Sequence, residues 1–364
     1  EISLFSILLT LMLTLEGKAE PHFDATVAAD GSGRFRTISE AISASPDHSL
    51  QKYYIKIKAG TYMERVYVGP EKTNIVLVGD GMGITVVTYN RSNRTGWDTI
   101  NSATVGMEVI YRLILWMSSV YEKPNNNAFV YLQPDIVGNG FIAKYITFEN
   151  SAGPENGQAV ALRSISKFST FYRCGFQGYQ DTLYVQKEIQ FYRECTIYGT
   201  IDFIFGNARV VFQNCDIYLH NPGKGRWNTV TAQGRTNYND FTGISVINCT
   251  IKAATDFNST LGTKTYLGRP WRPFATVVIM QSFLGDVIDL KGWHTWNDEA
   301  SAPESVYYGE FQNRGPGAPI MQRVSWEKHK VMNSSEAEKF TVRNFINGDS
   351  WIAPTNIPFF LDFI

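Results

Sequence analysis

Four short segments in the middle of the chain share one pattern: an apolar or aromatic run, a polar residue, a cysteine and then alternating apolar residues. Their cysteines follow one another at intervals of 21, 20 and 34 residues. Self-similarity with a period near 20 residues is typical of solenoids, and strand-rich units without a helix indicate a parallel β-helix. The segments are TFYRCGF (170–176), QFYRECTI (190–197), VVFQNCDI (210–217) and SVINCTI (245–251).

The rest of the chain is also typical of strands joined by turns. Val, Ile, Phe, Tyr and Thr recur in short runs that Gly and Asn interrupt, and helical periodicity is scarce. We therefore predict an all-β fold with a short N-terminal helix over 37–44 and long loops on one side. The last interval is explained by a long loop over 216–243. The alternative is a β-sandwich in which the four segments resemble one another by chance.

Two aspartates repeat with the same spacing as the cysteines that precede them. Asp181 and Asp202 are 21 residues apart, as are Cys174 and Cys195. Equivalent positions on adjacent coils lie about 4.8 Å apart, the distance between hydrogen-bonded strands, so the two carboxyl groups should stack. Gln158 lies 23 residues before Asp181 and can sit one coil further along. A single buried aspartate is usually structural, so the hypothesis of a functional site depends on the pair.

Two stacked carboxyl groups cannot both ionise comfortably, so one should keep its proton while the other stays anionic. The anionic group can attack a carbonyl carbon, and the protonated one can act as general acid and base. A cation would hold the nucleophile charged, and amide donors would stabilise the oxyanion. Arg269 is the candidate cation, and Gln158 and Gln180 are the candidate amide donors. Taken alone, Arg269 is more often a salt-bridge residue.

Charge and cysteine content restrict the kinds of partner, metal site and disulfide that the chain can have. The formal net charge of −1 gives no reason to expect nucleic acid as a partner. The sequence has no CxxC motif and no histidine cluster, so we expect no metal site. An even number of cysteines permits two disulfides in an oxidising compartment. Their spacing favours pairing of neighbours, Cys174 with Cys195 and Cys215 with Cys249, although sequence leaves the connectivity open.

Residues 1–19 are typical of a secretory signal. The apolar run Ile2–Leu15 is too short for a membrane span and precedes the small-x-small site Gly17-Lys18-Ala19. The first residue is glutamate rather than methionine, so we expect a truncated signal, and no membrane span after its removal. Secretion as a glycoprotein is also compatible with five sequons, at Asn90, Asn93, Asn248, Asn258 and Asn333, of which Asn248 lies in a strand-like repeat where a glycan would not fit.

The chain resembles the plant pectin methylesterases, or pectinesterases, over nearly all of 24–364. It is similar to their shorter type, which lacks an inhibitor-like pro-region. The motifs that carry the resemblance are GTYMERV (60–66), GQAVALR (157–163), GYQDTLYV (178–185), YGTIDFIFGNA (198–208) and TYLGRPW (265–271).

The resemblance implies one domain over 24–364, a right-handed single-stranded parallel β-helix of the pectin lyase-like type. It implies a secreted monomer that hydrolyses methyl esters of homogalacturonan in the plant cell wall without a cofactor, with a proteinaceous inhibitor as a possible partner. It assigns Asp202 as nucleophile and Asp181 as general acid and base. Arg269 then holds the nucleophile, and Gln158 and Gln180 stabilise the oxyanion. The aromatic residues it assigns to the sugar-binding cleft are Tyr184, Phe205, Trp271 and Trp293.

One segment departs from the family pattern, an apolar insertion at about 106–137. It is either a real loop or helix near the cleft or a stretch translated from sequence that is normally removed, and we favour the second because the flanking motifs resume intact. A real insertion could block the cleft and leave a catalytically impaired wall-binding protein. The rivals among enzymes are a polygalacturonase, whose carboxylates stand about 6.5–9.5 Å apart, and a lyase, which would need a cluster of acids for Ca²⁺.

Overall fold

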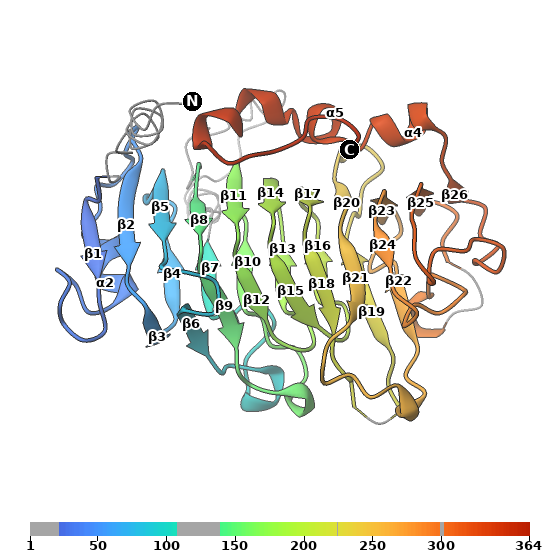
Figure 1. The fold of residues 1–364 in the computed structure, drawn as a ribbon, viewed down its shortest axis with the longest axis horizontal. Coiled ribbons are helices and arrows are strands. Elements are labelled where there is room, and N and C mark those ends of the chain that lie inside the picture. Colours follow the sequence, from blue (N-terminus) through green and yellow to red (C-terminus); the bar gives the residue numbers. More distant parts are fainter. Residues whose placement is uncertain (1–21, 108–138, 224, 299–301) are drawn as a thin grey trace, which may run out of the picture.

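The computed structural model describes residues 22–107, 139–223, 225–298 and 302–364. The signal-like segment 1–19 lies outside the described residues, as does almost all of the insertion at about 106–137. The described chain forms three parallel sheets, and each complete coil contributes one strand to each sheet in turn (Figure 1). The predicted right-handed parallel β-helix is therefore confirmed.

The sheets are named A, B and C. Sheet A contains β1 (Ala25–Val27), β2 (Tyr53–Ile57), β5 (Ile75–Val78), β8 (Ile142–Lys144), β11 (Ser169–Tyr172), β14 (Ile189–Arg193), β17 (Arg209–Gln213), β20 (Gly243–Ile247), β23 (Thr276–Met280), β25 (Tyr307–Phe311) and β26 (His329–Val331). Sheet B contains β3 (Gly60–Met63), β6 (Thr85–Tyr89), β9 (Thr147–Asn150), β12 (Gly175–Gln177), β15 (Thr196–Gly199), β18 (Asp216–Leu219), β21 (Thr250–Ala253) and β24 (Phe283–Leu284). Sheet C contains β4 (Val66–Val68), β7 (Val105–Met107), β10 (Leu162–Ser164), β13 (Leu183–Val185), β16 (Ile204–Gly206), β19 (Asn228–Gln233) and β22 (Thr265–Gly268).

The repeated sequence pattern marks the bend at which the chain passes from sheet A to sheet B. The apolar run forms the strand of sheet A, and the polar residue after it has a positive φ in every repeat. A left-handed residue turns the chain sharply without lengthening the coil, and polar side chains such as asparagine tolerate this conformation best. The four residues are Arg173 (φ 51°), Glu194 (φ 52°), Asn214 (φ 56°) and Asn248 (φ 48°).

Helices cover the N-terminal end and one face of the β-helix. The predicted N-terminal helix is confirmed as α2 (Ile38–Ser43), which begins at a capping box between Thr37 and Glu40. The C-terminal helices α4 (Ser334–Glu338) and α5 (Val342–Ile346) run across the strands of sheet A, and α5 packs on its outer face (Figure 1). None of the helices in the described ranges is long and apolar enough to cross a membrane.

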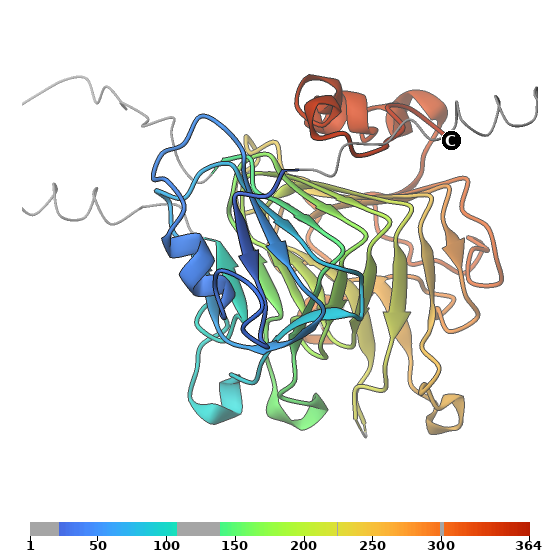
Figure 2. The same cartoon turned by 60° about the vertical axis from the view of Figure 1, so that its left-hand side comes forward.

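Loops with short 3₁₀ helices project together from one edge of the β-helix (Figure 2). They contain η1 (Asn93–Thr95), η2 (Pro154–Asn156) and η3 (Ser259–Leu261). The prediction of one long loop over 216–243 is wrong, because β18 and β19 lie within that stretch. This coil keeps its strands in sheets B and C, and its extra length is in the connections on either side of β19.

Aromatic rings stack along the axis inside the β-helix. Tyr192 lies between Phe171, at 4.6 Å between ring centroids, and Phe212, at 4.7 Å. All three side chains are fully buried. Identical positions on successive coils are one strand spacing apart, so flat rings can stack at each step. The stack contributes to the rigidity of the coils that carry the site described below.

Removing one ring from this stack should cost a large part of the protein's stability. We expect Phe171→Ala to lower the free energy of unfolding by about 3–5 kcal/mol, because the ring is fully buried and the stacked coils cannot close over the cavity. Urea denaturation followed by circular dichroism measures this. The control is Leu50→Ala, at a side chain that is 93% exposed, which should change stability by less than about 0.5 kcal/mol.

The four cysteines also form a ladder in the core, but the predicted disulfides are not present. All four are buried free thiols, so pairing of Cys174 with Cys195 and of Cys215 with Cys249 is not what the structure shows. Main-chain carbonyl groups accept from the thiols, for example Ala143 O from Cys174 Sγ at 3.4 Å and Phe171 O from Cys195 Sγ at 3.4 Å. Regular spacing therefore predicted the stacking of the cysteines correctly, but the bonds expected between them are absent from the stack.

Candidate active site

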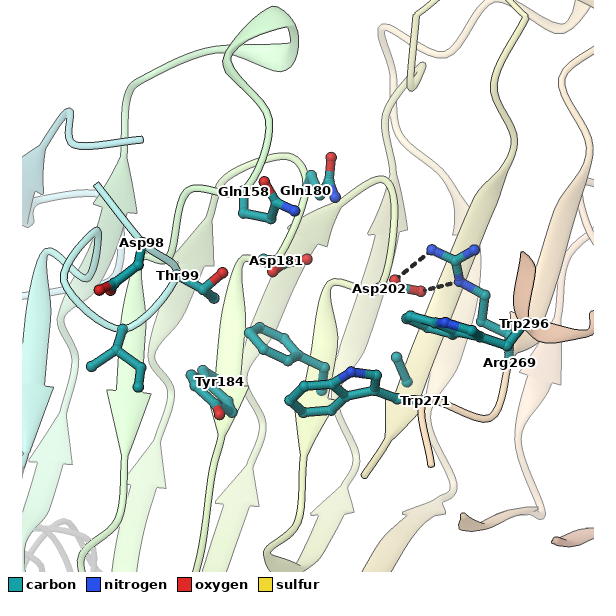
Figure 3. A pocket seen from close by; sticks show the side chains of 13 residues that line it. Asp98, Thr99, Gln158, Gln180, Asp181, Tyr184, Asp202, Arg269, Trp271 and Trp296 are labelled. Carbon is teal, nitrogen blue, oxygen red and sulfur yellow. Dashed lines mark hydrogen bonds and ion pairs between the residues drawn. The ribbon is translucent and has the colours of Figure 1, made fainter. Parts of the chain in front are cut away.

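A cleft of about 520 Å³ lies along sheet C, where successive coils enter its strands (Figure 3). The two aspartates, both glutamines and Arg269 all line it, so the structure brings together every residue predicted to take part in the chemistry. Each comes from the segment just before or after a strand of sheet C. The lining residues are Asp98, Thr99, Ile100, Gln158, Gln180, Asp181, Tyr184, Asp202, Phe205, Ala232, Arg269, Trp271 and Trp296.

Asp181 and Asp202 occupy equivalent positions on adjacent coils, as their spacing predicted. The amide of Asp181 donates to the carbonyl oxygen of Ile201 at 3.0 Å, and Leu183 pairs with Ile204 in the strands that follow. Both aspartates have a positive φ, 65° and 52°. Aspartate tolerates this conformation better than most residues, and backbone strain of this kind is common at functional sites. Both side chains turn into the cleft (Figure 3).

Arg269 holds the carboxylate of Asp202 in a two-point ion pair. Its Nε donates to Oδ1 at 2.9 Å and its Nη2 donates to Oδ2 at 2.7 Å. Both side chains are largely buried, so the pair is screened little by solvent. The guanidinium also lies over the ring of Trp296, with its central carbon 4.3 Å from the ring centroid. Paired in this way, Asp202 is held as an anion in a fixed orientation.

The environment of Asp181 favours the opposite protonation state. Burial, and then the neighbouring charge of Asp202, raise the pKa of Asp181 well above its ordinary value of 3.8, while Arg269 opposes the shift. Only 7% of Asp181 is exposed. The surroundings of Asp181 therefore favour its protonated form, beside a carboxylate that Arg269 binds at two points. This separation supplies an acid and a nucleophile from two identical side chains.

The two glutamines lie next to each other at the mouth of the cleft (Figure 3). The amide of Ala159 donates to the carbonyl oxygen of Gln180 at 3.1 Å, which places Gln158 alongside Gln180 on the preceding coil. The predicted position of Gln158, one coil from Asp181, is thus refined: its neighbour is Gln180. Two side-chain amides on the same side of the aspartates can donate to one oxyanion.

Aromatic side chains form the floor and one wall of the cleft. The rings of Tyr184 and Phe205 stack at 4.2 Å between centroids, and Trp271 meets both edge-on. The prediction for Trp293 is wrong: it is 1% exposed, packs on Tyr308 at 4.3 Å, and its indole N–H donates to Glu310 at 3.1 Å. Trp296 lines the cleft in its place.

Three features of the site were not predicted. Trp296 lies three residues after Trp293 in the same short motif, and sequence offers no way to choose between the two rings. The segment Asp98–Ile100 forms the wall at the other end of the cleft and carries no motif (Figure 3). Thr229 contacts Asp202, although it belongs to the stretch predicted as a loop. Among the described residues, no group of three or more His, Cys, Asp or Glu side chains could hold a metal ion.

Comparison with known proteins gives consistent matches along the chain. The family model "Pectinesterase" matches residues 24–117 and 121–349. The chain is 45% identical over 343 residues to "Pectinesterase/pectinesterase inhibitor PPE8B" of Prunus persica; this match covers 93% of the chain but only 60% of that relative. The solved structure "Pectin methylesterase from Carrot" is 43% identical, with a TM-score of 0.83 and coverage of 94% of this chain and 98% of that one. A pectin methylesterase from Aspergillus niger is 29% identical, with a TM-score of 0.73 over 92% of this chain and 96% of that one.

Proposed function

Since this chain belongs to the pectinesterase family, we propose that it hydrolyses the methyl esters of homogalacturonan to methanol and de-esterified pectate. The observation that carries the proposal is the stacked pair of aspartates, one anionic and bound by Arg269, the other protonated by its environment. The aromatic floor, on which Tyr184 stacks with Phe205, suits the apolar faces of sugar rings.

The reaction proceeds in two halves. Asp202 attacks the ester carbonyl carbon, and the side-chain amides of Gln158 and Gln180 donate to the oxyanion of the tetrahedral intermediate. Asp181 gives its proton to the methoxy oxygen as the C–O bond breaks, so methanol leaves and an acyl intermediate remains on Asp202. Asp181, now anionic, takes a proton from a water molecule that attacks the acyl carbon. Collapse releases the polymer carboxylic acid, which loses its proton to solvent, and restores Asp202 as the anion and Asp181 as the acid.

The proposal is tested directly by incubating the purified protein with highly methylated pectin. Methanol should appear together with an equal amount of new carboxylate, and the polymer should keep its length. Chain shortening would instead indicate a polygalacturonase or a lyase. A folded protein that releases no methanol from any methylated substrate would refute the esterase assignment.

Activity should show an optimum in pH. Below the optimum it falls because Asp202 must be anionic to attack, and above it falls because Asp181 must hold a proton to release methanol. Since burial raises the pKa of Asp181, its acid form persists well above pH 3.8, and the basic limb should lie at correspondingly higher pH. Initial rates of methanol release across the pH range measure this. A rate that does not decline on the basic side contradicts the role given to Asp181.

We also propose the location of the protein and its partners. Residues 24–364 form the catalytic domain, residues 1–19 direct secretion, and the mature protein acts as a monomer on methylated homogalacturonan in the cell wall. A proteinaceous pectin methylesterase inhibitor is a further candidate partner, an inference from family membership. N-terminal sequencing of the secreted protein tests the first part: a mature chain that begins close after Ala19 supports it.

A further inference from the structure

Thr229 lies beside Asp202 on the next coil of the β-helix. Its strand β19 pairs with β16 with Ile204 opposite Thr231, and this register, continued two residues back, brings Thr229 next to Asp202. The side chain is fully buried, and it does not belong to the lining of the cleft. It therefore cannot act on the substrate directly, and any effect on the reaction must pass through Asp202.

The hydroxyl group of Thr229 makes two hydrogen bonds to the same residue. It accepts from the backbone amide of Asp202 at 2.9 Å and donates to Oδ1 of the Asp202 carboxylate at 2.6 Å. A hydroxyl has one proton, and an amide N–H can only donate, so the proton must point to Oδ1. The hydroxyl group of Thr229 thus links the carboxylate of Asp202 to the backbone amide of Asp202. That backbone is in the left-handed conformation, which a neighbouring hydrogen bond must help to maintain.

These contacts make the two oxygens of Asp202 unequal. Among the described residues, Oδ1 accepts from both Thr229 and Arg269 Nε, whereas Oδ2 accepts from Arg269 Nη2. A carboxylate oxygen has two lone pairs in its plane, so these donors occupy both lone pairs of Oδ1 but only one of the two on Oδ2. A nucleophile attacks through a lone pair that is not already bound.

We propose that Thr229 is a positioning residue that makes Oδ2 the attacking oxygen of Asp202, an inference that rests on the proposed esterase function. Thr229 and Arg269 together fix the rotation of the carboxylate, so that Oδ2 faces the cleft before the substrate binds. The simpler alternative is that Thr229 only satisfies a buried amide and contributes to folding. The two accounts differ in what a substitution does to kcat and to the pH profile.

The experiment compares Thr229→Val, which keeps the shape and removes the hydroxyl, with Thr229→Ser, which keeps the hydroxyl. For Thr229→Val we expect kcat on highly methylated pectin to fall about 10- to 100-fold, the loss of one hydrogen bond to a charged group, with KM changed by less than about two-fold. The acidic limb of the pH profile should move to higher pH, because the anionic form of Asp202 loses a donor. Thr229→Ser should stay within about three-fold of wild type and keep the wild-type limb.

Within the described ranges, the charged and titratable groups around Asp202 are Arg269, Asp181 and, from the core, Tyr308, and all three are unchanged in both variants. Only the hydroxyl can therefore account for a shift of the limb. If Thr229→Val does not fold, Thr229→Cys, with a thiol as a weak donor, takes its place and should give a smaller shift in the same direction.

Each outcome has one meaning. An active wild type together with a Thr229→Val protein of unchanged kcat and unchanged acidic limb overturns the role of Thr229 and leaves the esterase function standing. If kcat falls equally in the valine and serine variants and the acidic limb of the pH profile does not move, only the packing of Thr229 matters. That result also overturns its role as a positioning residue. A wild type without activity overturns both the function and this inference.

Discussion

Asp202→Asn should abolish methanol release, with a loss in kcat of about 10⁴-fold or more. Removing the nucleophile of a covalent mechanism removes the pathway itself, and what remains is the small advantage of binding and of the oxyanion donors. The amide keeps the size of the carboxyl group and leaves one oxygen for Arg269, so the fold should persist. The test is methanol release by the purified variant, with circular dichroism to confirm the fold.

The matched control is Asp216→Asn, at an exposed aspartate on β18, a strand of the following coil. It makes the same chemical change outside the cleft and should leave kcat and KM at wild-type values. Residual activity of Asp202→Asn above about 1% would mean that attack does not depend on Asp202. In that case direct attack of water, assisted by Asp181, would become the better mechanism.

Asp181→Asn should separate activity from stability. We expect kcat to fall about 10²- to 10⁴-fold, because asparagine cannot transfer a proton to methoxide or take one from water. The same substitution should stabilise the protein near neutral pH. Asp181 is buried beside an anion, and asparagine removes the cost of ionising a carboxyl group there while tolerating the left-handed backbone.

The sign of the pH dependence follows from proton binding. The pKa of Asp181 is raised on folding, so between pH 3.8 and that raised pKa the folded state binds a proton that the unfolded state has lost. Wild-type stability should therefore decline relative to the variant as pH rises through this window, and the two should be equally stable below pH 3.8. Thermal unfolding at several pH values measures the difference. A variant less stable than wild type near neutral pH would show that Asp181 contributes a structural bond that outweighs its burial.

Sequence could predict the stacked aspartates because the repeat is regular where they lie. Asp181 and Asp202 fall on coils of nearly constant length, so equal spacing in sequence becomes equal position in space. The next coil is longer, and Thr229 follows Asp202 by more than one period, so periodicity gave no sign that the two residues touch. In the regular part of a solenoid, counting residues predicts which side chains are neighbours. In the irregular part, only the three-dimensional structure shows them.

Trp293 and Trp296 show a second limit of sequence. Trp293 pairs with Gly268 through an isolated parallel bridge and turns inward to Tyr308 and Glu310, whereas Trp296 turns back over Arg269. Both are large aromatic residues in one short motif, and burial is favourable for either. The partners that distinguish them, Glu310 for Trp293 and Arg269 for Trp296, are distant in sequence or carry no mark of the contact.

The distance between the two aspartates is set by backbone hydrogen bonds between adjacent strands, and this has a consequence for how such a protein can change. A spacing fixed by the main chain is insensitive to the length of the connections, as the long coil between β17 and β20 shows. Mutation can therefore lengthen, shorten or recharge the segments that border the cleft, including Asp98–Ile100, without disturbing the reacting pair. The segments that contact the substrate can therefore change independently of the residues that react. A family with this fold can acquire different substrate preferences while the reaction stays the same.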